Sequence, residues 1–190
     1  MKLSEKVFWF DVETTGLIPK KHDIVQLGYI IEINHNIVEE GKFLAQPFNY
    51  DTIEKSALEC NKLTIETIKT FPEPKKVHLQ ILALLDKYID KYNKQDKFIA
   101  AGYNVDFDIQ MFNEFFKKNN HLYFWSYFDY HKLDPITFIF MLEYKGLISL
   151  ENHRLANVCK YFGININAHD ALEDIKATRE LVYKLMGYLK

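Results

Sequence analysis

The sequence predicts an α/β fold in which a mixed five-stranded sheet is flanked by helices. Three observations lead to this prediction. The apolar run at 7–10 is typical of a central strand that is covered on both faces. Residues 24–33 and 37–46 are rich in β-branched residues and are separated by a turn at 34–36, which favours an antiparallel meander. Helical spacings of apolar residues then alternate with two further short strands.

The elements follow from these patterns in order. Pro47 ends the third strand, and residues 52–74 predict short helices and loop. Amphipathic or capped stretches predict helices at 75–92, 106–119, 135–144, 152–162 and 170–189, and apolar runs predict strands at 98–103 and near 130–133. This order of strands and helices favours a mixed sheet over a doubly wound parallel one.

The bulk composition bounds the class of protein. A chain of 190 residues fits one domain, here 1–190, and the net charge of −2 argues against a tight, non-specific DNA binder. Cys60 and Cys159 are expected to be reduced, buried thiols. Residues 1–6 leave no room for a signal sequence, and no apolar stretch reaches membrane length. We therefore expect a cytoplasmic protein with no membrane partner.

Two carboxylates end the first strand. Asp11 and Glu13 alternate with Val12, so both point to the same face, about 7 Å apart along the backbone. Carboxylates at a buried strand end are costly unless a positive charge compensates them, and a divalent metal ion bound through oxygens does so. A pair of solvated or N-capping acids is the alternative. Thr14-Thr15-Gly16 adds hydroxyls, amides and a permissive turn that suit gripping the end of a ligand.

Further acids and a histidine lie near the starts of two later helices. Asp106 can cap the helix at 106–119, and Asp108 lies in its first turn, beside a strand end. His169 lies at the start of the last helix and Asp174 about one and a half turns inside it. Each residue alone also fits a blander role, as a helix cap, a helix-dipole partner or a solvated side chain.

Three short motifs follow one another along the chain: D-x-E-T-T-G at 11–16, N-x-x-F-D at 104–108 and H-D-A-x-x-D at 169–174. In this order they resemble the DEDDh family of 3′→5′ exonucleases, most of all the proofreading subunits of bacterial DNA polymerase III. The likeness spans residues 10–181, and 153–164 is similar to the helix that precedes the family's last motif. Each motif is weak alone, but three in register are specific.

The resemblance implies a ribonuclease-H-like fold and a site for two divalent metal ions, Mg²⁺ or Mn²⁺. It implies that Asp11 bridges both ions, that Glu13 and Asp174 complete the nucleophile side, and that Asp108 serves the second ion. It chooses Asp108 over Asp106 because the family's acid follows an aromatic residue. His169 would then accept the proton of the attacking water, a role that suits a side chain with a pKa near neutrality.

The resemblance also implies a pocket for the 3′ end of a nucleic acid. Leu17 would be an apolar wedge against the terminal base, with Phe107 as a second contact and Thr14-Thr15 on the terminal sugar. Asn104 and Tyr103 would lie near the substrate. Tyr103 is a departure, since the family often has histidine there, and it bears on nucleotide handling more than on the metals.

The expected function is therefore metal-dependent 3′→5′ hydrolysis of single-stranded or frayed DNA ends to nucleoside 5′-monophosphates, in proofreading or repair. An RNA-trimming exonuclease or oligoribonuclease with the same chemistry is an alternative. Leu133-Asp134-Pro135 is weakly similar to a segment of such enzymes. A catalytically silent nucleic-acid-binding subunit is less consistent with four clustered acids. The chain has no polymerase segment, so proofreading would require a polymerase partner in trans.

Overall fold

The predicted mixed five-stranded sheet is confirmed. A computed structural model describes residues 6–166 and 170–189, and in it the strands lie in the order β3-β2-β1-β4-β5. The first three strands pair antiparallel, and β4 and β5 are added parallel to β1. The strands are β1 (Lys6–Thr14), β2 (Ile24–Ile33), β3 (Asn36–Leu44), β4 (Phe98–Ala101) and β5 (Phe128–Leu133).

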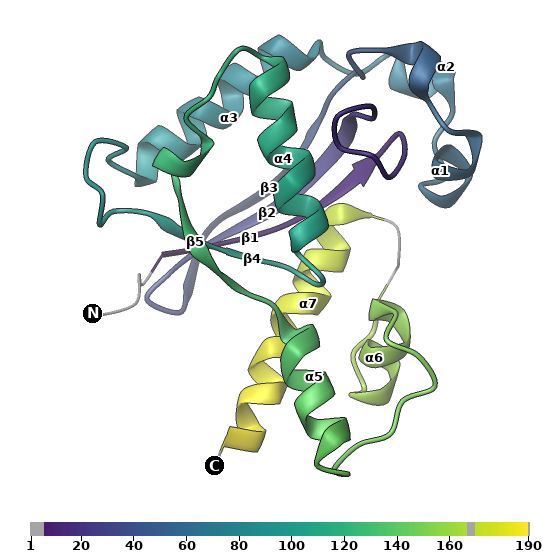
Figure 1. Cartoon of the computed structure of the whole chain (residues 1–190), viewed down its shortest axis with the longest axis vertical. Helices are drawn as coiled ribbons and strands as arrows, with labels where there is room; N and C mark the ends of the chain where they lie inside the picture. Colours follow the sequence, from purple (N-terminus) through teal and green to yellow (C-terminus); the bar gives the residue numbers. More distant parts are fainter. Residues whose placement is uncertain (1–5, 167–169, 190) are drawn as a thin grey trace.

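Helices of the described part cover both faces of the sheet. They are α1 (Lys55–Cys60), α2 (Ile65–Ile68), α3 (Pro74–Tyr88), α4 (Asp106–Lys118), α5 (Pro135–Tyr144), α6 (Leu155–Tyr161) and α7 (Ala171–Met186), with 3-10 turns η1 (Tyr50–Thr52), η2 (Phe124–Ser126) and η3 (Gly187–Leu189). Figure 1 shows α3 and α4 on one side of the sheet and α7 on the other.

Alternation along β1 divides the core between these two faces. Phe8 and Phe10 are fully buried in the larger cluster, against α3 and α4. Trp9 points the other way, into the cluster that contains Ile175 and Val182 of α7. Because side chains alternate along a strand, the residues two and four positions after Trp9 also face α7. This alternation sends the two acids of β1 toward that helix.

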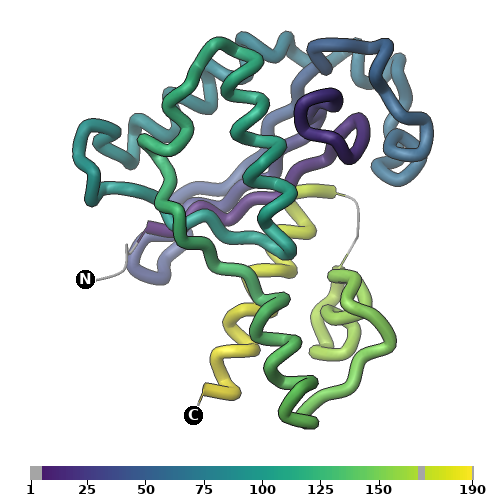
Figure 2. Tube along the Cα trace, in the orientation of Figure 1, coloured from purple at the N-terminus to yellow at the C-terminus, as the bar shows by residue number. Residues whose placement is uncertain are grey.

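Helices α5 and α6 form a separate lobe against the outer side of α7. Ile139 of α5, Val158 of α6 and Leu181 of α7 are all fully buried in one cluster. Figure 2 shows the chain leaving the end of β5, entering α5 away from the sheet and returning through α6. This lobe therefore lies next to the start of α4, where β4 ends.

Several boundaries differ from the sequence prediction. Strand β4 ends at Ala101, not at 103, and at Gly102 the chain comes so close to β1 that an added Cβ would lie 2.7 Å from the Phe10 carbonyl oxygen. The helix expected at 75–92 ends at Tyr88, and the one expected at 152–162 spans only Leu155–Tyr161. The last helix gives way to a 3-10 turn after Met186.

The prediction for the cysteines was half wrong. Cys159 is buried as expected, but Cys60 is exposed, because the short helix α1 turns Leu58 inward and leaves its last residue at the surface. Over the described residues, no helix combines the length and apolar character needed to cross a membrane.

Candidate active site

Three carboxylates meet where β1 runs beneath the start of α7. Asp11 and Glu13 come from the α7-facing side of β1, and Asp174 lies in the first turn of α7. One side-chain oxygen from each lies within 4.8 Å of the other two. The sequence predicted that Asp11 and Glu13 share a face, and the structure adds Asp174 to the same place.

A close contact between β2 and α7 brings Asp174 to the strand. Gly28 pairs with Asp11 across the sheet, and a Cβ added to Gly28 would lie 2.3 Å from the carbonyl carbon of Ala171. Further along, the Arg179 Nε atom lies 2.5 Å from a carboxylate oxygen of Glu32, which is buried in β2. The absence of a side chain at Gly28 lets α7 approach the strands closely, and the buried ion pair between Arg179 and Glu32 holds it there.

Asp108 reaches the same region from the start of α4. Its side chain is buried, and its Oδ1 atom accepts a hydrogen bond from the Val12 amide at 3.0 Å. This bond turns Asp108 toward the backbone between the two acids of β1. The oxygens of Asp108 are not among the three that lie within 4.8 Å of one another.

Asp106 has a different role from the cap considered for it. Val105 occupies the N-cap position of α4 without a side-chain bond, and Asp106 is the first residue of the helix. The Asp106 carboxylate is exposed and pairs with Lys132 of β5. The structure thus places Asp108, and not Asp106, beside the acids of β1.

Burial and mutual repulsion disfavour the charged forms of these acids. Burial raises the pKa of Asp11 well above its usual range, and the charges of Asp108, Glu13 and Asp174 raise it further. Burial, followed by the charges of Asp174 and Asp170, raises the pKa of Glu13 to about 7. For Asp108, burial outweighs the Val12 amide, so its pKa is also raised. Converging oxygen ligands whose charged forms are disfavoured by burial and repulsion fit a divalent cation.

The loop after β1 holds its own polar groups. The Thr14 hydroxyl donates to the Gly16 carbonyl at 2.9 Å, and the Thr15 hydroxyl accepts from the Asp23 amide at 2.9 Å. Both threonines are buried, so their hydroxyls shape the loop. Leu17 at its tip has 75% of its surface exposed, which leaves this apolar side chain available to a ligand.

The other predicted substrate residues lie around the start of α4. Phe107 is partly buried against the core, while Asn104 is exposed and has a positive φ of 55°. The Tyr103 hydroxyl donates to the His153 carbonyl at 2.6 Å. Tyr103 therefore ties this turn to the segment before α6. Burial raises the pKa of Tyr103 well above its usual value.

A cleft of about 760 Å³ opens beside the acids. It lies between the start of α4 and the lobe of α5 and α6, and Asp174 forms part of its wall. The remaining lining residues are Tyr103, Asn104, Ile136, Phe140, His153, Arg154, Leu155, Ala156 and Ile166. The cleft thus joins the acids to a surface with aromatic and basic side chains.

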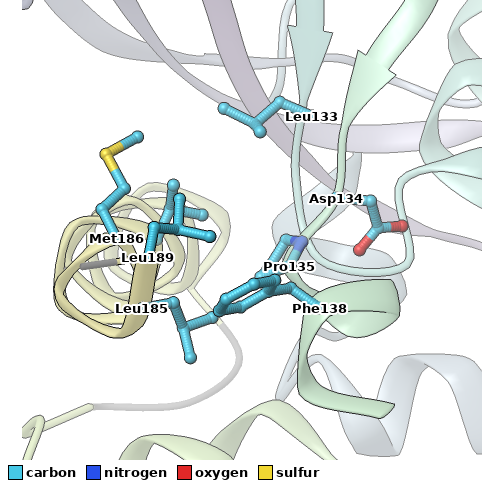
Figure 3. Close-up of a pocket in the computed structure, with 8 residues that line it drawn as sticks. Leu133, Asp134, Pro135, Phe138, Leu185, Met186 and Leu189 are labelled. Atoms are coloured by element: carbon cyan, nitrogen blue, oxygen red, sulfur yellow. The ribbon is translucent and has the colours of Figure 1, made fainter. Parts of the chain in front are cut away.

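Asp134, which the sequence interpretation passed over as a site residue, organises two turns at this cleft. Its carboxylate accepts from the Ile136 amide at 3.0 Å, capping α5, and from the Asn104 and Val105 amides at 3.1 and 3.0 Å. Figure 3 shows this carboxylate turned away from a small apolar pocket between Phe138 and the end of α7. The Asp-Pro pair at the start of a helix was the available signal for the cap.

His169 lies outside the described residues, so its predicted role stays a prediction. Its neighbour Asp170 is the N-cap of α7 and accepts from the Leu172 amide at 3.1 Å. Asp170 also pairs with Lys42 of β3 at 2.6 Å, which lowers its pKa despite its partial burial. Asp170 thus caps α7 and also ties the start of that helix to β3.

A family model described as an exonuclease matches residues 8–182. Among curated proteins, a PolC-type DNA polymerase III of Oceanobacillus iheyensis is 26% identical over 182 residues, which are 95% of this chain and 11% of that protein. The chain thus spans about a tenth of the length of that relative. An oligoribonuclease of Haemophilus influenzae is 27% identical over 202 residues, covering 98% of this chain and 96% of that enzyme.

Solved structures with the same fold include an E. coli ExoI complex with single-stranded DNA. That structure matches with a TM-score of 0.78 at 20% identity, over 98% of this chain and 43% of the other. A product-bound structure of exonuclease I matches with a TM-score of 0.76 at 19% identity, over 98% and 46%. At this identity the likeness establishes the fold, which agrees with the ribonuclease-H-like sheet expected from the sequence.

Proposed function

This chain belongs to the RNase T-type exonuclease family, and we propose that it is a metal-dependent 3′→5′ exonuclease that releases nucleoside 5′-monophosphates from single-stranded or frayed DNA ends. The convergence of Asp11, Glu13 and Asp174 oxygens within 4.8 Å is the observation that carries this proposal. A nucleic-acid-binding module without catalysis has no use for buried, mutually repelling acids in its binding face.

The four acids would bind the metal ions, and His169 would act as the base. Asp11, Glu13 and Asp174, whose oxygens converge, would hold one divalent cation, and Asp108, fixed by the Val12 amide, would serve a second. When bound, such cations make water more acidic and neutralise charge on the phosphate. His169 accepts the proton of the attacking water. Because Glu13 has a pKa of about 7 without metal, metal binding at neutral pH should release protons.

A pocket for the 3′ terminus around Leu17 would account for attack from the end of a strand. The loop that carries Leu17 is held by the Asp23 amide on Thr15 and by Asn61, whose side-chain amide donates to the Thr14 carbonyl at 2.9 Å. Exposed Leu17 and partly buried Phe107 would contact the terminal base. Stacking of this kind is sequence-tolerant and worth about 1–3 kcal/mol per base, which suits a frayed end.

The test combines metal removal with a comparison of strand ends. EDTA should abolish release of mononucleotides, and Mn²⁺ or Mg²⁺ should restore it. Linear single-stranded DNA should be degraded from the 3′ end, while a circular copy should resist and a blunt duplex should be cut more slowly. Undiminished hydrolysis in EDTA would refute the metal proposal. Cutting of the circle as fast as the linear strand would refute the exonuclease proposal.

A second candidate function is hydrolysis of short RNA. The oligoribonuclease relative matches over nearly its whole length, whereas the polymerase relative matches over a tenth of its own. RNA and DNA differ at the 2′-hydroxyl, so rates on matched RNA and DNA oligomers of two to five nucleotides separate the two functions. A preference for long DNA would favour proofreading or repair, with a polymerase as the partner. Co-purification with the host replicative polymerase tests that partnership.

A further inference from the structure

We propose that the cleft between α4, α5 and α6 binds the strand on the upstream side of the scissile bond, with the Phe140 ring stacking on a base and the Arg154 guanidinium contacting a phosphate. This proposal rests on the proposed exonuclease function and assigns residues that the three motifs do not contain. It makes the α5–α6 lobe a second part of the substrate site.

The cleft lies directly beside the acids. Asp174 forms part of its wall, and Phe140, His153 and Arg154 line the same cleft. A volume of about 760 Å³ is within the range of sites that enclose a ligand of nucleotide size. A strand whose terminal nucleotide contacts Leu17 has to leave the acids across some surface, and this cleft begins at them.

The aromatic surface of the cleft is held in place. The Phe140 and His153 rings lie with their centroids 4.4 Å apart at an interplanar angle of 37°. The His153 Nε2 atom lies 2.5 Å from a carboxylate oxygen of Glu143, and the Tyr103 hydroxyl donates to the His153 carbonyl at 2.6 Å. Glu143 also accepts from the Leu150 amide at 3.0 Å. The two rings thus form a prepared platform, and Phe140 keeps 50% of its surface exposed.

Arg154 carries a positive charge that is available at the cleft. The chain has two arginines, and Arg179 is bound to buried Glu32. Arg154 is exposed on the cleft wall, and in the described part of the chain no carboxylate pairs with its guanidinium. A polyanion approaching a cluster of acids needs a positive contact nearby. A planar guanidinium matches the geometry of a phosphate and can bind it through two parallel hydrogen bonds.

Two substrates distinguish an effect on the proposed subsite from an effect on hydrolysis itself. The p-nitrophenyl ester of thymidine 5′-monophosphate has a 3′-terminal nucleotide but no upstream strand, whereas an oligo-dT has both. We expect Phe140→Leu and Arg154→Gln each to lower the ratio of kcat/KM on oligo-dT to kcat/KM on the ester by about 5- to 100-fold, the range that one stacking or phosphate contact supplies. Phe140→Trp keeps an aromatic face and should restore most of the ratio.

Matched controls lie on the same two helices. Met141 of α5 is exposed outside the cleft, and Lys160 is an exposed cation of α6 outside the cleft. Met141→Leu and Lys160→Gln should leave the ratio as in the wild type. Melting temperatures of all variants should agree within a few degrees, because each altered side chain is at least partly exposed.

Binding measured in Ca²⁺ gives an independent readout. For fluorescein-labelled oligo-dT, Arg154→Gln should reduce the slope of log K against log salt by about 0.7, the value for one phosphate contact on a single strand. Lys160→Gln should keep the wild-type slope. An unchanged ratio in Phe140→Leu and Arg154→Gln, together with an unchanged slope in Arg154→Gln, would overturn the subsite. A wild-type protein that hydrolyses neither substrate would overturn the proposed function together with the subsite.

Discussion

Gly28→Ala should disable the acid cluster without touching an acid. The added Cβ would lie 2.3 Å from the Ala171 carbonyl carbon and 2.4 Å from the Leu172 amide nitrogen, both backbone atoms. Ordinary carbon contacts are about 3.5–4.0 Å, so the start of α7 would have to retreat by about 1 Å. Asp174 lies in that first turn and would move with it.

The expected size of the effect follows from this displacement. Overpacking of a core contact costs about 1–3 kcal/mol, and a misplacement of about 1 Å in a catalytic constellation costs about 10²-fold in rate. Gly28→Ala should therefore lower the free energy of unfolding by about 1–3 kcal/mol and lower kcat on oligo-dT by about 100-fold. It should also weaken Mn²⁺ binding measured by calorimetry.

Gly187 offers the matched control. Its φ is −60°, and an added Cβ would meet nothing within 4 Å, so Gly187→Ala should leave activity and metal binding unchanged. Urea denaturation and the rate on oligo-dT measure both variants. If Gly28→Ala retained wild-type activity at wild-type stability, the idea that α7 depends on a side-chain-free position of β2 would be wrong.

Three further predictions concern single groups. Asp11→Asn should be nearly inactive, yet in EDTA it should melt about 2–4 °C higher, since about 1 kcal/mol of repulsion is relieved; a lower melting temperature would contradict the repulsion. His169→Ala should lower turnover by about 10²- to 10⁴-fold while keeping the stabilisation by Mn²⁺, and loss of that stabilisation would make His169 a ligand. Burial and the nearby His121 lower the pKa of His78 to about 4, so the unfolded chain binds the extra proton first. Stability should therefore fall as pH drops from about 6.5 to 4, by up to about 3 kcal/mol, and urea titrations should show this loss reduced in His78→Phe.

The sequence predicted the fold well where patterns are local. The apolar run of β1, the meander of β2 and β3 and the Pro135 start of α5 all appear as expected. The shared face of Asp11 and Glu13 follows from strand geometry, and in the structure both lie with Asp174 in one group. The family resemblance is likewise confirmed by the match over residues 8–182.

Contacts between segments that are distant in the sequence could not be predicted from local patterns. Gly28 reads as an ordinary strand residue, and only the packing of α7 shows why it lacks a side chain. Asp106 pairs with Lys132 of β5 because β4, which leads into α4, lies next to β5 in the sheet. Cys60 was expected to be buried because its sequence neighbours are apolar, but the orientation of a six-residue helix is set by what it packs against. Phe140 and Arg154 lie in none of the three motifs, and only the cleft shows that they line one surface.

The single carboxylate of Asp134 has a consequence for substrate choice. It binds the amides of Asn104 and Val105 at the start of α4 and the amide of Ile136 at the start of α5. The helix that carries Asp108 and the helix that carries Phe140 therefore share one anchor, which would set the distance between the acids and the proposed strand subsite. In the proposed exonuclease, this shared anchor would restrain α4 and α5 from moving apart at this point. Its preference among nucleic acids would then depend mainly on the side chains that line the cleft.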